Sequence, residues 1–247
     1  LFKNDNSVND DGSEGNNFTL GAGTLTKTED CPSNVFATLN PLQRLDDYNL
    51  TLGNNRFTNT SAGAHRAVHS TLSAFSGKYY AEVKVTTLGG TYPQIGVINP
   101  NVMDYTTYLG ASNKGYGYLS NGNKQYNNSA TSWGNTYTTN DIIGIAMDLD
   151  NHKLYFSKNG TFQESGDPTS GSTGTGAAYS LATGVFYGFA QSAYDSGTDP
   201  VYDWNFGNGY FGTTAVSSAG TNASNNGIFE YDVPAGYTAL STKGLNL

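Results

Sequence analysis

The sequence predicts an all-β protein, and three observations support this prediction. No stretch of about 12 residues shows the 3.6-residue periodicity of an amphipathic helix. Apolar and polar residues instead alternate in many short runs that turn-forming residues separate. The 247 residues include 31 glycines and 18 tyrosines, which are typical of turns and strands, respectively. Many short strands joined by turns indicate a β-sandwich or a β-barrel.

The first long strand is expected at residues 77–88. Because side chains alternate along a strand, Tyr79 and Val83 face one side, and Tyr80 and Glu82 face the other. Residues 94–98 form a short apolar run before a proline-containing loop. Further strands are expected, in chain order, at residues 115–119, 124–126, 141–149, 153–157, 185–193 and 201–206.

Turn residues and apolar runs justify these later strands. Asn121 and Gly122 separate two apolar runs, and an Asn-Gly pair predicts a tight hairpin because both residues tolerate positive φ. The run 142–147 is expected to be buried on both faces, with a hairpin turn following it. Trp204 and Phe206 are two residues apart in the last strand, so both point to one face. Residues 163–178 are expected to form a long surface loop.

The charge pattern excludes several classes of partner. Twelve basic and twenty acidic residues give a net charge of −8, and the arginines Arg44, Arg56 and Arg66 are scattered. A nucleic-acid surface would need a basic patch, so no nucleic acid is expected. No apolar run approaches the ~20 residues of a membrane helix, so no membrane insertion is expected. The chain begins at Leu1 without a leader pattern, which indicates processing or a segment of a longer protein.

No catalytic or cofactor motif is evident, and the chain is predicted to be non-enzymatic with no cofactor and no metal. The single cysteine, Cys31, excludes an internal disulfide. Phosphate-loop and nucleophile-elbow motifs are absent. His65 and His69 lack further zinc ligands. An acidic cluster at Asp5, Asn6, Asp10, Asp11 and Glu14 lacks the spacing of a calcium loop.

Five ordered blocks resemble the SPRY domain. They are residues 77–83 (GKYYAEV), 95–97 (IGV), 116–124 (YGY followed by NGNK), 141–160 (DIIGIAMDLD followed by LYFSKNG) and 204–207 (WNFG). This resemblance implies an antiparallel, concanavalin-like β-sandwich of the jelly-roll type. Glycosidases of that shape carry a Glu-x-Asp strand, which this sequence lacks. Glu82 is therefore interpreted as a strand residue bound to a neighbouring loop, and Asp148 and Asp150 as turn formers.

The flanking residues are similar to segments that bracket SPRY domains in tailed-phage structural proteins, including those of marine phages. They are residues 34–41 (NVFATLNP) and 233–243 (VPAGYTALSTK). Residues 15–19 (GNNFT) are similar to the end of a laminin-G-like domain. We therefore divide the chain into a loop-rich N-terminal extension (1–54), a SPRY-like sandwich (55–212) and a closing segment packed on the sandwich (213–247).

Loop tyrosines are the candidate binding residues, because tyrosine offers rigid contact area and a hydrogen-bonding group. The resemblance implies that loops gather at one end of the sandwich. The candidate ligand-binding residues are Tyr92, Asp104, Tyr105, Tyr108, Tyr137 and Tyr194. They should tolerate alanine, whereas Ile143, Ile145, Phe156 and Phe206 should be core residues.

The resulting functional prediction is a viral structural or interaction module located in the virion. It would be a tail-fibre, head-fibre or capsid-decoration component. Its partners would be other virion proteins or a host-surface receptor, either protein or glycan, and it would act as an oligomer or in a symmetric assembly. Two alternatives remain: a cellular SPRY-type adhesion module that binds a peptide, extracellular or at the cell surface, or a lectin.

Overall fold

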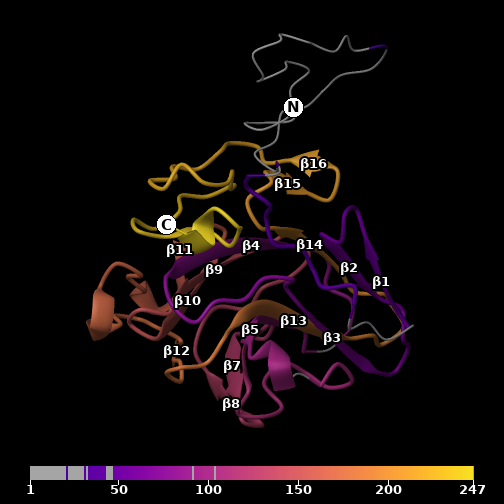
Figure 1. The fold of residues 1–247 in the computed structure, drawn as a ribbon. Coiled ribbons are helices and arrows are strands. Elements are labelled where there is room, and N and C mark those ends of the chain that lie inside the picture. The colour runs from indigo at the N-terminus through magenta and orange to yellow at the C-terminus, as the bar shows by residue number, and fades with distance from the viewer. Residues whose placement is uncertain are drawn as a thin grey trace.

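Two antiparallel sheets face one another in the computed structural model of the chain (Figure 1). The structure describes residues 21, 31, 33–42, 47–90, 92–102 and 104–246. Among them, no helix is long and apolar enough to cross a membrane. The short 3-10 helices are η1 (Pro100–Val102), η2 (Gln163–Ser165), η3 (Gly171–Thr173) and η4 (Gly244–Asn246).

The larger sheet has nine described strands in the order β1-β2-β14-β4-β9-β10-β11, with β12 beside β10 and β17 beside β4. They are β1 (Tyr48–Thr51), β2 (Arg56–Asn59), β4 (Lys78–Thr87), β9 (Ile142–Asp148), β10 (Lys153–Lys158), β11 (Thr161–Phe162), β12 (Tyr179–Ser180), β14 (Val201–Asn205) and β17 (Thr238–Ala239). Among the described pairs of this sheet, β17 and β4 are parallel and all the others are antiparallel.

The smaller sheet has six described strands in the order β3-β13-β5-β6-β7-β8. They are β3 (His65–His69), β5 (Gln94–Ile98), β6 (Gly115–Leu119), β7 (Asn123–Tyr126), β8 (Ser129–Ser132) and β13 (Gly188–Tyr194). A separate pair is formed by β15 (Tyr210–Phe211) and β16 (Thr214–Ala215). The predicted all-β sandwich with antiparallel sheets is confirmed.

The core between the two sheets is rich in aromatic residues. Trp204 of the larger sheet stacks on Phe206, which directly follows β14, with ring centroids 4.9 Å apart. Both rings contact Phe189 of the smaller sheet. Tyr118 and Phe156 make a similar contact across the sheets. The predicted core residues Ile143, Ile145, Phe156 and Phe206 are all essentially inaccessible to solvent.

A third layer covers the outer face of the larger sheet, and the C-terminal segment supplies most of it (Figure 1). Phe229 packs edge-on against Tyr80 with ring centroids 5.1 Å apart. The strand β9 beside Tyr80 carries Gly144, where a Cβ atom would lie 2.5 Å from the Tyr80 hydroxyl. A side chain at position 144 would therefore force the Tyr80 hydroxyl and the Ser157 hydroxyl, 2.4 Å from that Cβ, to shift, which favours glycine there.

The sheet begins earlier in the chain than the predicted boundary at residue 55. Strand β1 starts at Tyr48 and pairs with β2. The turn between them places Leu52, Gly53 and Asn54 at positive φ. Glycine and asparagine signal such a turn in the sequence, but leucine does not. Most of the predicted N-terminal extension lies outside the described residues, including the acidic cluster between Asp5 and Glu14.

Candidate functional site

A groove with a volume of about 410 Å³ lies at one end of the smaller sheet. We call it the end groove. Strands β3, β5 and β7 begin there, and β6 and β13 end there. The described residues that line it are His65, Tyr92, Gln94, Tyr108, Leu119, Asn121, Asn123, Gln125 and Ala130. None of these side chains is an acid, a lysine or an arginine, so the groove favours uncharged ligand groups.

His65 is held between two tyrosines at one side of the end groove. The centroid of its ring lies 5.3 Å from that of Tyr108 and 5.0 Å from that of Tyr194. Its Nδ1 atom is buried and has no hydrogen-bond partner among the described residues. Burial lowers the pKa of His65 below 6.5, so the ring is neutral near pH 7. A neutral imidazole offers one donor and one acceptor.

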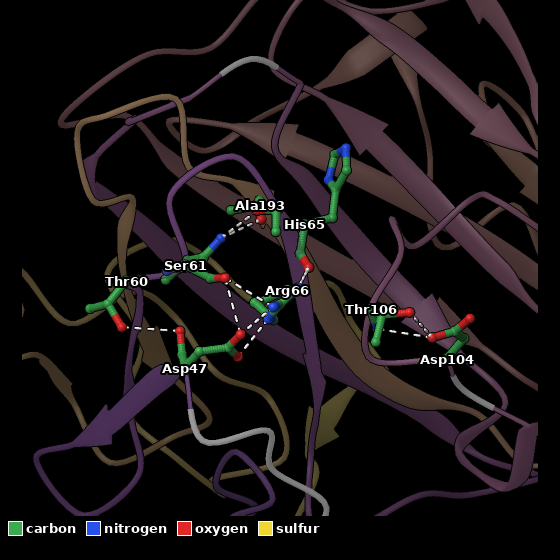
Figure 2. Close-up of polar contacts among 10 residues, drawn as sticks. Asp47, Thr60, Ser61, His65, Arg66, Asp104, Thr106 and Ala193 are labelled. Carbon is green, nitrogen blue, oxygen red and sulfur yellow. Dashed lines mark hydrogen bonds and ion pairs between the residues drawn. The ribbon is translucent and has the colours of Figure 1, made fainter.

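An arginine network fixes the start of β3 and therefore the position of His65 (Figure 2). Arg66 donates to both carboxylate oxygens of Asp47 and to the Ser61 hydroxyl. It also donates to the His65 carbonyl oxygen at 2.6 Å. These donors hold the pKa of Asp47 at about 2. Because successive side chains alternate, the His65 ring points away from this network.

Amide side chains form another part of the groove. Gln94 accepts a hydrogen bond from the Gly110 backbone N–H at 2.9 Å and donates to Gln125 at 2.7 Å. The Gln125 amide nitrogen makes no hydrogen bond within the described part of the chain. An amide group both donates and accepts, as a peptide group does. The groove can therefore pair with a ligand that carries peptide or hydroxyl groups.

The loop before β5 closes a further side of the groove. Tyr92 is 53% exposed and has φ of 62°, an unusual conformation for a tyrosine. Nearby, a Cβ atom on Gly90 would lie 1.8 Å from the Tyr194 carbonyl oxygen. The backbone of this loop therefore packs directly on the end of β13, and only glycine permits that approach.

The structure brings three of the six predicted binding residues together. Tyr92 and Tyr108 line the groove, and Tyr194 contacts the His65 ring that lines it. Tyr105 lies nearer the other end of β3, where its hydroxyl is 3.1 Å from Nε2 of His69. Asp104 is exposed and accepts hydrogen bonds from Thr106 (Figure 2). Whether any of them binds a ligand stays a prediction.

Tyr137 requires a correction, because it is not an exposed loop residue. It is 2% exposed, and its hydroxyl lies within hydrogen-bonding distance of the Pro93 and Tyr118 carbonyl oxygens, at 2.9 and 3.0 Å. Its ring packs edge-on against Tyr118. Tyr137 therefore packs beneath the loop that carries Pro93 and the strand that carries Tyr118, and its side chain is not available to a ligand. Its polar neighbours in the sequence concealed this burial.

Sequence reasoning missed most of the polar groove residues. From the sequence, His65 lacks the further ligands of a zinc site, and Gln94, Asn121 and Asn123 fall in predicted strands or turns. The pairing of β3 with β13 brings His65 beside Tyr194 from a distant part of the chain. The sequence carries no local signal of that pairing.

The buried carboxylate of Glu82 has a structural role, as expected. It accepts hydrogen bonds from the backbone N–H groups of Glu230 and Tyr231, at 2.9 and 3.0 Å. These bonds join β4 to the C-terminal segment. Burial raises the pKa of Glu82 to about 7, although the two N–H groups oppose this shift. Elsewhere in the described chain, no three His, Cys, Asp or Glu residues cluster as metal ligands would.

Comparison with known protein families identifies the family to which the sandwich region is similar. Residues 78–193 match the SPRY domain family. These residues form a SPRY domain. A crystal structure of the SPRY domain of human HERC1 is similar, with a TM-score of 0.54 and 16% identity. The similarity covers 67% of this chain and 96% of that one, so it shows the same fold.

Two curated relatives share part of the SPRY region. The ATP-dependent RNA helicase DDX1 of Xenopus laevis is 32% identical over 91 residues, covering 37% of this chain and 12% of the relative. Ran-binding protein 9 of Homo sapiens is 33% identical over 106 residues, covering 42% of this chain and 14% of the relative. The chain thus matches less than a fifth of either protein. SPRY domains are protein-interaction modules, which fits the partner class expected from the sequence.

Proposed function

We propose that the chain is a non-enzymatic interaction module that binds an extended peptide segment of a partner protein in the end groove. The cluster of His65, Tyr108 and Tyr194 carries this proposal. Aromatic residues and amides at one end of a rigid sandwich suit recognition, since they supply contact area and paired donors and acceptors. The absence of charged side chains from the described lining favours polar, uncharged ligand groups at the contact.

Alanine substitution in the groove tests this proposal. A displayed library of random peptides of about nine residues, ~30 Å long when extended, is screened for peptides that bind the whole chain. Tyr108→Ala and Tyr194→Ala should each weaken the selected peptides about 30-fold, as central interface tyrosines do. The control is Phe75→Ala, which removes a 57% exposed aromatic ring beside Phe186 at the opposite end of β13.

The control variant should bind as the unaltered chain does. The proposal fails if no peptide is selected, or if Tyr108→Ala and Phe75→Ala bind equally well. Melting temperatures of all variants separate a binding defect from unfolding.

The cellular, peptide-binding alternative receives more support than the virion assignment. The relatives described above are vertebrate proteins, and nothing in their names concerns a virus particle. A tail-fibre, head-fibre or capsid-decoration role, a place in the virion or at the cell surface, oligomerisation and glycan binding all stay predictions. A glycan array probed with the whole chain tests glycan binding, and the neighbouring genes test the viral assignment.

A further inference from the structure

The edge of the smaller sheet is a short, unprotected strand. Strand β8 consists of Ser129, Ala130, Thr131 and Ser132, and all four residues are exposed. It lies at the lower margin of the fold in Figure 1. The strand lacks the lysine, proline or bulge with which proteins commonly block a sheet edge. The opposite edge differs, because the Tyr105 carbonyl oxygen accepts a hydrogen bond from the backbone of Ala67 in β3.

The backbone groups that β8 presents can be identified from its pairing with β7. Tyr126 pairs with Ser129 across a two-residue turn in which Asn127 and Asn128 both have positive φ. Such a turn is closed by a hydrogen-bonded pair, and bonded and non-bonded pairs then alternate. Ala130 and Ser132 therefore direct their N–H and C=O groups away from β7. None of these four groups has a partner among the described residues.

A hollow flanks β7 and β8 on each face. Ala130 lines the end groove on one face. On the other face, Ser129 and Thr131 line a second hollow of about 230 Å³, together with Lys124, Tyr126 and Tyr179. A strand added beside β8 would direct alternate side chains to the two faces. Both hollows are therefore within reach of one extended segment.

The second hollow contains Lys124, which makes no salt bridge with the described residues. The Nζ atom of Lys124 donates to the Ala178 carbonyl oxygen at 2.8 Å and lies 5.5 Å from the centroid of the Tyr179 ring. Within the described part of the chain, no carboxylate oxygen lies within 4.0 Å of it. Burial lowers the pKa of Lys124, and the negative charge of Glu164 opposes this shift without forming a salt bridge. A carboxylate from a partner would be complementary to this charge.

We propose that β8 receives an extended segment of a partner protein as an additional strand, with an acidic side chain of that segment reaching Lys124. The segment bonds to the backbone of Ala130 and Ser132, and its opposite-facing side chains enter the end groove. This mode is β-strand addition. A second copy of β8 fits less well, since serine, alanine and threonine carry no carboxylate for Lys124. The inference rests on the proposed peptide-binding function and specifies how the peptide is held.

A matched pair of variants at residue 132 tests the strand addition. Ser132→Pro removes the outward N–H without breaking the bonds to β7, because proline is tolerated at such edge positions. Ser132→Ala removes the hydroxyl and keeps the N–H. For peptides selected on the whole chain, Ser132→Pro should weaken binding about 5- to 10-fold, and Ser132→Ala should leave it unchanged. Melting curves check that both variants fold.

A charge exchange tests the contact with Lys124. Lys124→Gln should weaken the binding of a selected acidic peptide several-fold. When the acidic residue of the peptide is replaced by the matching amide, the unaltered chain and Lys124→Gln should bind it equally well. The inference fails if Ser132→Pro and Ser132→Ala bind the selected peptides with equal affinity while Tyr108→Ala loses binding. The proposed peptide-binding function would stand in that case. Failure of every selection would refute both. A concentration-dependent dimer that Ser132→Pro abolishes would make a second copy the occupant and overturn the proposal.

Discussion

Replacing Glu82 by glutamine tests how the C-terminal layer is held on the sandwich. Oε2 of Glu82 accepts from the Glu230 N–H and the Asn205 amide, at 2.9 and 3.3 Å. Oε1 accepts from the Tyr231 N–H and the Tyr80 hydroxyl, at 3.0 and 3.2 Å. The glutamine side chain has nearly the same shape, but it does not titrate.

The magnitude follows from the pKa of Glu82. Burial raises this pKa from 4.5 to about 7 in the folded protein, so the folded chain binds the proton more tightly than the unfolded chain. The resulting stabilisation is fully present below pH 4.5 and is lost as the pH rises to about 7. Each pKa unit corresponds to about 1.4 kcal/mol. The loss over this window therefore amounts to about 3 kcal/mol.

Urea denaturation of both proteins at a series of pH values measures the effect. The quantity of interest is the free energy of unfolding of the unaltered chain minus that of the Glu82→Gln variant. This difference should fall by about 3 kcal/mol between pH 4.5 and pH 8. His65 and His69, whose pKa values burial lowers, titrate in both proteins and cancel in the difference. A difference that grows with pH would refute the reasoning, because it would mean that the folded protein prefers the charged carboxylate. A constant difference would refute it as well, because it would mean that folding leaves the pKa of Glu82 unchanged.

Four further substitutions test the packing. Phe156→Ala removes a fully buried ring and should lower the free energy of unfolding by about 3–5 kcal/mol, measured by urea denaturation. Tyr137→Ala should cost a similar amount, whereas Tyr92→Ala should change stability by less than about 0.5 kcal/mol; equal losses would contradict the burial assigned to Tyr137. Arg56→Lys loses the two-bond contact with Asp203, at 2.6 and 2.7 Å, and should lower the melting temperature through a loss of about 1–2 kcal/mol. An unchanged melting temperature would contradict that last expectation.

The strands of the core could be predicted because they carry apolar residues in regular patterns. Residues 142–147 predicted a strand buried on both faces, and β9 is buried along its whole length. Strand β8 was missed, because Ser-Ala-Thr-Ser has no apolar alternation. Its turn was missed as well, because it uses Asn127 and Asn128 without a glycine.

The site was harder to predict than the fold, because its residues come from distant segments. Tyr92, Tyr108 and Tyr194 could be chosen from composition and from the expected gathering of loops. Tyr137 was chosen on the same grounds, but its ring is buried. Exposure depends on tertiary packing, which a local sequence pattern does not encode.

Mapping the contact surface by NMR tests the central claim most directly. Backbone amide shifts of the isotope-labelled whole chain are followed as a selected peptide is added. The account predicts that the largest changes occur at Tyr92, Gln94, Tyr108 and Asn121, around the end groove. Changes concentrated instead around Phe75, at the opposite end of the sandwich, would contradict it.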